Sequence, residues 1–167
     1  MNTQETREKL EQAYEKMVER IHNLWDSGES QHSLKQAILH ARDKAEELQE
    51  ITREEANKVA DYVSRDLHEM GGYLHETGEE LRDWFRFDVE LIEDRMLEKL
   101  ISVADKTRLE LSALQEHNRE ASRWHTGEVT GPGTLICRQC GEQLHFKKTG
   151  HIPPCPKCHK TEFKRAV

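Results

Sequence analysis

All four cysteines of this 167-residue chain lie in two Cys-x-x-Cys pairs near its C-terminus. The first pair is Cys137 and Cys140, the second is Cys155 and Cys158, and 14 residues separate the pairs. Two residues between cysteines let one tight turn direct both thiolates to a common centre, and the interval suits a hairpin that brings the second pair to the same ion. The spacing therefore predicts a tetrahedral, structural Zn²⁺ site, with one ion per chain, in a small β ribbon.

The residues around the cysteines support this interpretation. Gly141 follows the first pair, where a residue able to take positive φ is useful, and His159 stands at the same place after the second. The expected apolar core of the ribbon is small: Leu135, Leu144, Phe146, Ile152 and Phe163. A core of five side chains is too small to fold alone, so we expect the module to depend on its metal. Structural zinc contributes about 10–16 kcal/mol of apparent binding free energy to folding.

Other uses of the cysteines are weaker. Disulfides belong to oxidising compartments, whereas the N-terminus shows no signal peptide, so we expect a cytoplasmic protein with reduced thiols. Iron of the rubredoxin type uses similar cysteine pairs and is the alternative to zinc. His145, His151 and His159 are near enough to be alternative ligands, although four thiolates complete the coordination sphere. A closed sphere predicts no catalysis at the metal.

Charge divides the chain into two parts. From residue 134 to 167 there are seven Lys or Arg against two acidic residues, a net charge of +5, which leaves 18 basic and 30 acidic residues before it, a net charge of −12. Aromatic residues make up 6% of the chain, which is little core material for an α/β domain, and no apolar run approaches the length of a membrane span. The sequence predicts a soluble acidic body that carries a basic tip.

The acidic body is expected to be helical, because it has no proline before Pro132 and shows apolar stripes at helical spacing. A first helix is expected from about Thr3 to Trp25. Residues 33–70 are expected to form one kinked helix or two, since Thr52 to Glu55 matches a capping box, and Gly71-Gly72 should end this segment. A third, long helix is expected from Thr77 to about Trp124, where the indole would seat the ribbon.

These elements predict a mainly α protein: an elongated antiparallel helical hairpin or three-helix bundle, coiled-coil-like, with a small C-terminal all-β zinc ribbon. The expected domains are a helical bundle over residues 1–126, a linker over 127–133 and the ribbon over 134–167. The apolar stripes are narrow, so a homodimer through the helices is possible.

Few motifs in the body point to an enzyme. Glu19 with His22, and Glu29 with His32, have the Glu-x-x-His spacing of di-iron carboxylate bundles, but 32 acidic residues and 10 histidines produce such pairs by chance. There is no phosphate-binding glycine loop and no nucleophile elbow. The aromatics of the run 84–87 cannot all face one seam, so one ring is left for a partner surface or a neighbouring helix, and internal packing is the favoured use. We expect a protein that is not an enzyme, with a helical di-metal enzyme as a remote alternative.

The chain resembles a family of bacterial zinc-ribbon-containing proteins of uncharacterised function. The resemblance is carried by Gly71 to Leu74, the segment from Leu81 to Leu100 with Trp84, Gly131 to Leu135, and the two cysteine pairs with Gly141 and Pro156. It implies a cytoplasmic, bacterial, metal-binding protein and supplies no catalytic residues.

Two functions follow from this organisation. In the first, the helices present the basic ribbon to a protein partner with an acidic surface, or the ribbon docks on the acidic helices of its own chain. In the second, the ribbon contacts nucleic acid in transcription or translation, as a net charge of +5 allows. The first is favoured, because the acidic body would repel a polyanion and no dense arginine or aromatic platform accompanies Lys147 and Lys148.

Overall fold

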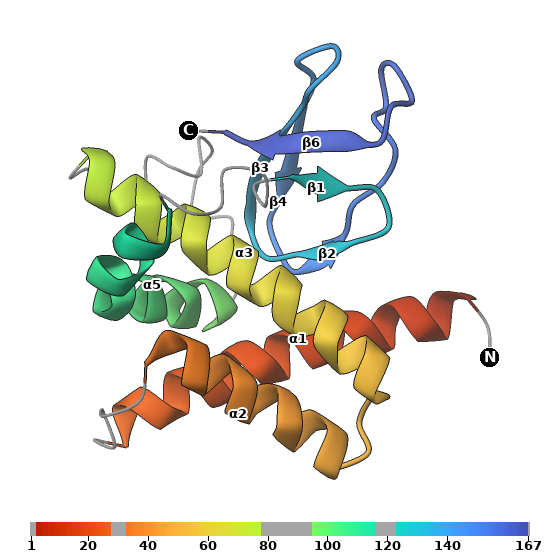
Figure 1. Cartoon of the computed structure of the whole chain (residues 1–167). Coiled ribbons are helices and arrows are strands. Elements are labelled where there is room, and N and C mark those ends of the chain that lie inside the picture. The colour runs from red at the N-terminus through yellow and green to blue at the C-terminus, as the bar shows by residue number, and fades with distance from the viewer. Residues whose placement is uncertain (1–2, 28–32, 78–94, 116–122, 167) are drawn as a thin grey trace.

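The computed structural model describes residues 3–27, 33–77, 95–115 and 123–166. They form a helical body and a β-rich C-terminal part that lies against one side of it (Figure 1). The described helices are α1 (Thr3–Asp26), α2 (Leu34–Glu47), α3 (Arg53–Thr77) and α5 (Arg95–Gln115). The expected mainly α class, with a C-terminal β region carrying four cysteines, is confirmed.

Two capping boxes divide the segment 33–70 into two helices. The Thr52 amide donates to Glu55 Oε2 at 2.8 Å and the Glu55 amide donates to Thr52 Oγ1 at 3.3 Å. The same reciprocal pair joins Ser33 and Gln36 at the start of α2. Each box satisfies backbone N–H groups that a helix start leaves without partners, so the chain turns between α2 and α3 instead of continuing as one kinked helix.

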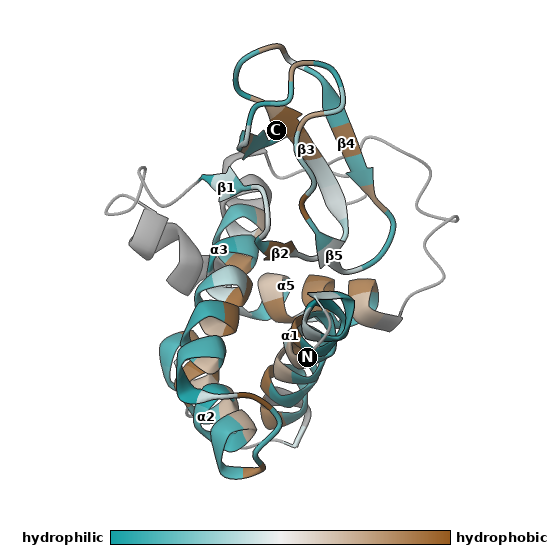
Figure 2. Ribbon diagram, turned by 90° about the vertical axis from the view of Figure 1, so that its right-hand side faces the viewer, coloured by the Kyte–Doolittle hydropathy of each residue, from teal (hydrophilic) through white to brown (hydrophobic). Residues whose placement is uncertain are grey.

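The apolar stripes read from the sequence form one core shared by the four described helices. Figure 2 shows their hydrophobic residues on the sides that face one another. The fully buried side chains of this core include Tyr14, Met17 and Ile21 of α1, Val63, Leu67 and Met70 of α3, and Leu100 of α5. The helix expected over Thr3 to Trp25 is confirmed as α1. Pairing with a second copy of the chain stays a prediction.

The expected helix ends in the middle of the chain are wrong. Helix α3 runs through Gly71-Gly72 to Thr77. Leu67 and Met70, one turn before the glycines, are fully buried in the core shared with α5, and this packing outweighs the cost of about 1 kcal/mol per glycine in a helix.

The ends expected for the third helix are also wrong, because Thr77 belongs to α3 and Trp124 lies in a β-strand, while residues 95–115 of the expected helix form α5. Within the described residues, the apolar stripe expected for this segment is confirmed, because Met96, Leu100 and Val103 are buried. The aromatic run 84–87 lies outside the described residues. Among the described residues, no helix has the length and apolar character that a membrane crossing requires.

The C-terminal part consists of six short strands in two antiparallel sheets. They are β1 (Trp124–His125), β2 (Val129–Thr130), β3 (Gly133–Cys137), β4 (Gln143–Phe146), β5 (Gly150–His151) and β6 (Glu162–Arg165). The larger sheet has the order β1-β6-β3-β4, and β2 pairs with β5 in the smaller one. The sheet pairing of the ribbon therefore starts at Trp124, before residue 134, and runs through part of the segment 127–133.

Each part has its own core. In the ribbon, Trp124, Leu135, Ile152 and Phe163 are buried, while Leu144 and Phe146 are partly buried against them. Val129 instead belongs to the helical core, although it lies in a strand. The β region is thus packed onto the helical body, and Figure 1 shows β2 next to α3.

Candidate metal centre

The four cysteines come together at one point, as the spacing predicts. Their sulfur atoms all lie within 4.8 Å of one another, and the Cys137 to Cys158 and Cys140 to Cys155 distances are both 3.5 Å. A tetrahedral zinc with Zn–S bonds of about 2.3 Å requires sulfur separations of about 3.8 Å. The thiols are not joined in disulfides. The arrangement fits a Zn²⁺ ion with four sulfur ligands.

Two equivalent turns hold these sulfurs. We call them the first and second knuckles, residues 137–142 and 155–160. In the first, the Cys137 amide donates to the Glu142 carbonyl at 2.8 Å, and in the second, the Cys155 amide donates to the Lys160 carbonyl at 2.9 Å. Both knuckles contain the same hydrogen bond at the same sequence separation, so they have the same backbone geometry. Each knuckle directs its two thiols toward the common centre of the four sulfurs.

The residue after each second cysteine has a left-handed backbone. Gly141 has φ 77° and His159 has φ 59°. This conformation lets the Gly141 amide reach the Cys137 carbonyl at 3.0 Å and the His159 amide reach the Cys155 carbonyl at 2.9 Å. The role expected of these positions is confirmed, and His159 carries the strain that a glycine would avoid.

The thiols differ in acidity. Burial raises the pKa of Cys155, but N–H groups of Cys158 and Lys157 that bond to its sulfur outweigh burial, and its pKa is about 7. The Glu142 N–H lowers the pKa of Cys140, whereas burial and the neighbouring thiols raise it, to about 12. Four thiolates so close together need a cation to balance them, which is the charge that Zn²⁺ supplies.

The histidines considered as ligands lie elsewhere. His145 Nδ1 is 2.9 Å from Thr134 Oγ1, and His151 Nδ1 is 2.9 Å from Glu11 Oε1 on α1. Neither these residues nor His159 belongs to the metal-ligating group found among the described residues. The ligand set is four sulfurs, which leaves no coordination position for a substrate.

The carboxylate and histidine pairs of the body do not form a second centre within the described residues. Glu19 Oε1 accepts from Lys99 Nζ at 2.8 Å, and this hydrogen bond lowers the pKa of Glu19. Glu29 and His32 lie outside the described residues.

A second buried polar site, which the sequence did not reveal, joins α3 to the ribbon. The carboxylate of Asp66 is fully buried, and both of its oxygens accept hydrogen bonds. Oδ2 accepts from Tyr14 Oη at 2.7 Å, from Thr130 Oγ1 at 3.1 Å and from the Gly131 amide at 2.8 Å. Oδ1 accepts from Trp124 Nε1 at 2.9 Å. One carboxylate thus connects two helices with two segments of the C-terminal part, strand β1 and the consecutive residues Thr130 and Gly131.

Two arginines face this carboxylate. Arg65 Nε lies 3.3 Å and Arg165 Nη2 lies 3.4 Å from Asp66 Oδ1, and the guanidinium carbons lie 4.8 Å and 5.0 Å from the Trp124 ring centroid. Arg65 also forms an ion pair with Glu128. Two positive and two negative groups balance one another, which makes their burial tolerable.

The charges determine the acidity of the site. Burial alone would raise the pKa of Asp66, but Arg65, Arg165 and the hydrogen bonds from Gly131 and Tyr14 hold its pKa below the usual range. Burial, together with the adjacent Asp66 charge, raises the pKa of Tyr14 well above its usual value. Asp66 is therefore a carboxylate and Tyr14 a neutral donor at neutral pH.

The approach of the two parts is close. A Cβ atom added to Gly131 would lie 2.8 Å from Tyr14 Oη and 3.0 Å from Leu100 Cδ1. Gly131 is thus packed against both α1 and α5. The expectation that Trp124 seats the ribbon is confirmed, although the indole does so from strand β1 and not from a helix end.

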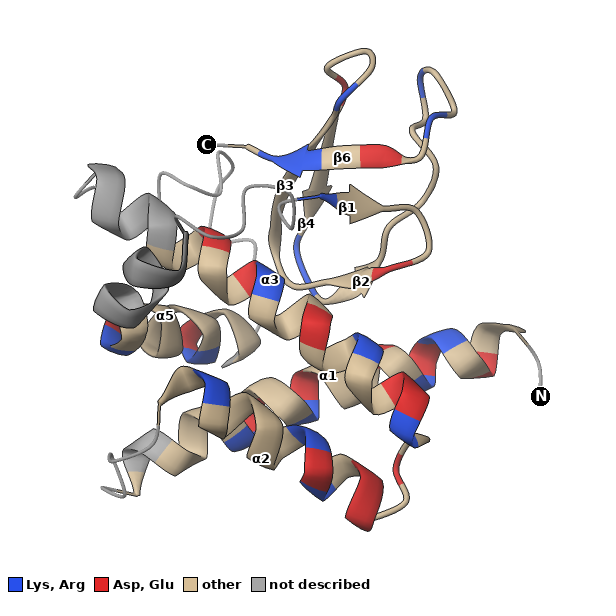
Figure 3. Ribbon diagram, viewed as in Figure 1, with Lys and Arg blue, Asp and Glu red and all other residues tan. Residues whose placement is uncertain are grey.

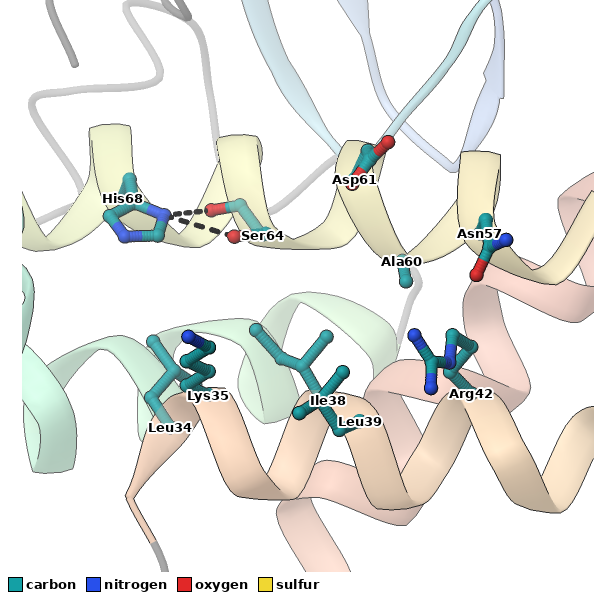
Figure 4. A pocket seen from close by; sticks show the side chains of 10 residues that line it. All are labelled: Leu34, Lys35, Ile38, Leu39, Arg42, Asn57, Ala60, Asp61, Ser64 and His68. Atoms are coloured by element: carbon teal, nitrogen blue, oxygen red, sulfur yellow. Dashed lines mark hydrogen bonds between the residues drawn. The ribbon is translucent and has the colours of Figure 1, made fainter.

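A cavity of about 450 Å³ lies between α2 and α3, separate from both sites. Figure 4 shows its lining: Leu34, Lys35, Ile38, Leu39, Arg42, Asn57, Ala60, Asp61, Ser64 and His68. His68 Nδ1 donates to the Ser64 carbonyl, which leaves Nε2 as the acceptor when the ring is neutral.

A zinc ribbon docked on a helical body is the class of protein that this fold and its four-cysteine centre define. Residues 24–167 match the family model described as "Zinc-ribbon containing domain", so the chain belongs to this family. It is similar to the "Uncharacterized protein YbeL" of Escherichia coli strain K12, with 27% identity over 157 residues that cover 94% of this chain and 96% of the relative. The protein of that name from Escherichia coli O157:H7 has the same identity and coverage. No solved structure matches the chain. The family resemblance seen in the sequence is confirmed.

Proposed function

We propose that this protein is an interaction protein, not an enzyme, that uses the exposed basic end of its zinc ribbon to bind a protein partner with an acidic surface. The observation that supports this is the exposure of the knuckle end while another side of the ribbon is covered by the helices. Arg138 in the first knuckle and Lys157 and Lys160 in the second are all exposed. Figure 3 shows Lys or Arg positions, in blue, in the two loops at the end of the ribbon that points away from the helices.

The zinc ion keeps Arg138, Lys157 and Lys160 close together on one surface of the ribbon. Because the four sulfurs lie within 4.8 Å of one another, the two knuckles are side by side. Lys157 Nζ lies 4.0 Å from Glu142 Oε2 across them, and both side chains are exposed enough for water to weaken this pair. The metal therefore presents Arg138, Lys157 and Lys160 as one fixed patch, which we call the basic tip.

The charges favour a protein over a nucleic acid as the partner. Four thiolates and one Zn²⁺ carry a net charge of −2, which part of the basic tip balances. The remainder of the chain, residues 1–133, has a net charge of −12 and repels a polyanion at low salt. A partner protein with a small acidic patch can bind the basic tip without coming close to the acidic helical body.

The test is capture from the native cell with cross-linking, using the full zinc-loaded chain and two charge-reversal variants. The first variant is R138E/K157E/K160E, and the control is K35E/R53E/K58E, which reverses three exposed cations on the helices. The partner should be captured by wild type and the control and lost with the tip variant. Its purified form should then bind wild type less tightly as salt rises.

Two results would contradict the proposal. One is a set of captured proteins that the tip variant and the control hold equally well. The other is retention of a mixed-sequence oligonucleotide in filter binding at low salt that is lost in the tip variant, which would assign the tip to nucleic acid. Two zinc or iron ions per chain, with the second lost in E19Q or H22A, would favour the di-metal enzyme.

A further inference from the structure

The ribbon contacts the buried carboxylate of the helical body through strands β1, β2 and β6. Trp124 of β1 and Thr130 of β2 donate hydrogen bonds to the Asp66 carboxylate. Arg165 of β6 forms an ion pair with Asp66 and donates to Thr130 Oγ1 at 3.0 Å. Every one of these contacts requires the ribbon strands to be in place.

Strand β6 links the contacts to the metal. Cys137, a metal ligand, pairs across the sheet with Phe163, and Arg165 follows two residues later on the same strand. Trp124 pairs with Phe163 from the other side. Phe163 is buried in a core that also contains Cys137 and Cys155. Trp124 and Arg165, which reach Asp66, therefore lie on the two sides of the sheet position held by Phe163, and Trp124 and Phe163 share one small core with the zinc ligands Cys137 and Cys155.

This core cannot hold the ribbon alone. Beyond the cysteines, the fully or nearly fully buried side chains are Trp124, Leu135, Ile152 and Phe163. A module with so little buried apolar surface folds on its metal. Loss of zinc therefore withdraws Trp124, Thr130 and Arg165 from Asp66 together.

The helical side would then change as well. Asp66 would keep Tyr14 and Arg65 but would lose its partners from the ribbon, and a buried carboxylate that loses partners draws water in. Val129, which belongs to the helical core, would leave with the ribbon. The face of α1 and α3 that carries Tyr14 and Asp66, here called the covered face, would be open to solvent.

We propose that the protein is a zinc-responsive switch, in which zinc binding docks the ribbon on the helices and zinc loss uncovers the covered face. Coupling of this kind is reciprocal. A change at Asp66, which is no metal ligand, must then alter the affinity for zinc, because docking stabilises the zinc-bound ribbon.

Hydrogen exchange of the full chain with and without zinc tests the first half. After chelation, exchange should rise at least about tenfold in peptides around Tyr14 and Asp66 as well as in the ribbon, and rise less in α2, which packs mainly on α1 and α3. Faster exchange confined to residues 123–166, with the covered face unchanged, would overturn the proposal.

Zinc competition against a chromophoric chelator tests the reciprocal half. D66N should bind zinc roughly tenfold or more weakly, because it loses at least one buried hydrogen bond to a charged group. G131A, whose added Cβ would meet Tyr14 Oη at 2.8 Å, should act in the same direction. D61N makes the same chemical change at an exposed position of α3 and should leave zinc affinity unchanged.

Far-UV circular dichroism confirms that each variant keeps its helices. Wild-type affinity in both folded D66N and folded G131A would overturn the proposal. If D66N fails to fold, the zinc affinity of G131A and the hydrogen exchange of the wild type still test the proposal.

Discussion

The substitution of Asp66 by asparagine should destabilise the protein more than any exposed change on the same helix. Asparagine keeps the shape of aspartate but offers one acceptor oxygen instead of two. The hydroxyls of Tyr14 and Thr130 can rotate to accept from the new NH₂ group, so we expect the amide to turn its nitrogen toward them. The Gly131 N–H, which now donates to Oδ2 at 2.8 Å, then has no acceptor.

The magnitude follows from these losses. A buried N–H without an acceptor costs about 1–3 kcal/mol. Removing one partner of a buried ion pair costs about 3–5 kcal/mol, and here the cost is at the lower end, because Arg65 keeps Glu128. Together these losses should lower the free energy of unfolding by about 4–6 kcal/mol, a large fraction of the roughly 5–15 kcal/mol typical of a domain.

Urea unfolding of the zinc-loaded full chain, followed by circular dichroism, measures this loss. D61N is the matched control and should change the free energy of unfolding by no more than about 0.5 kcal/mol. A loss below about 1 kcal/mol for D66N, with an unchanged slope against urea, would refute the assignment of Asp66 as the main polar contact between helices and ribbon.

Three further predictions concern the metal centre and pH. H159G should stabilise the zinc-loaded ribbon by about 1 kcal/mol and G141A should destabilise it by a similar amount, because both residues have positive φ, which favours glycine. The unfolding temperatures of the two variants should therefore shift in opposite directions. C155S should release the metal while most of the helical signal in far-UV circular dichroism persists, and retained zinc would count against the ligand set. Because the folded pKa of Asp66 is depressed, its contribution is present above its unfolded pKa of about 3.9 and is lost as pH falls through the folded value. The stability difference between wild type and D66N should thus be constant from about pH 5 to 8 and shrink below about pH 4, as acid titrations of both would show.

The metal site could be predicted because its signal is local. Cys-x-x-Cys spacing determines the knuckle geometry within a few residues, and even the left-handed backbone at His159 followed from its equivalence to Gly141. The buried faces of α1 and α3 could be predicted for the same reason, since helical periodicity reports which residues share a side.

The buried polar site at Asp66 through which the ribbon docks could not be predicted, because its contacts join residues far apart in the chain. Asp66 and Trp124 are 58 positions apart, and little in the sequence separates Asp66 from the other acidic residues of a charged body. A carboxylate beside Val63 and Leu67 in an apolar stripe was the available hint. The predicted helix ends near Gly71 and Trp124 were wrong for a related reason, because tertiary packing outweighed the local preference of these residues.

Zinc K-edge absorption of the purified full chain, together with its metal content, tests the central claim most directly. The account predicts one zinc per chain with four sulfur neighbours at about 2.3 Å and no nitrogen or oxygen neighbour. A spectrum with a histidine nitrogen or a water oxygen at the metal, or a chain purified with iron in place of zinc, would contradict it.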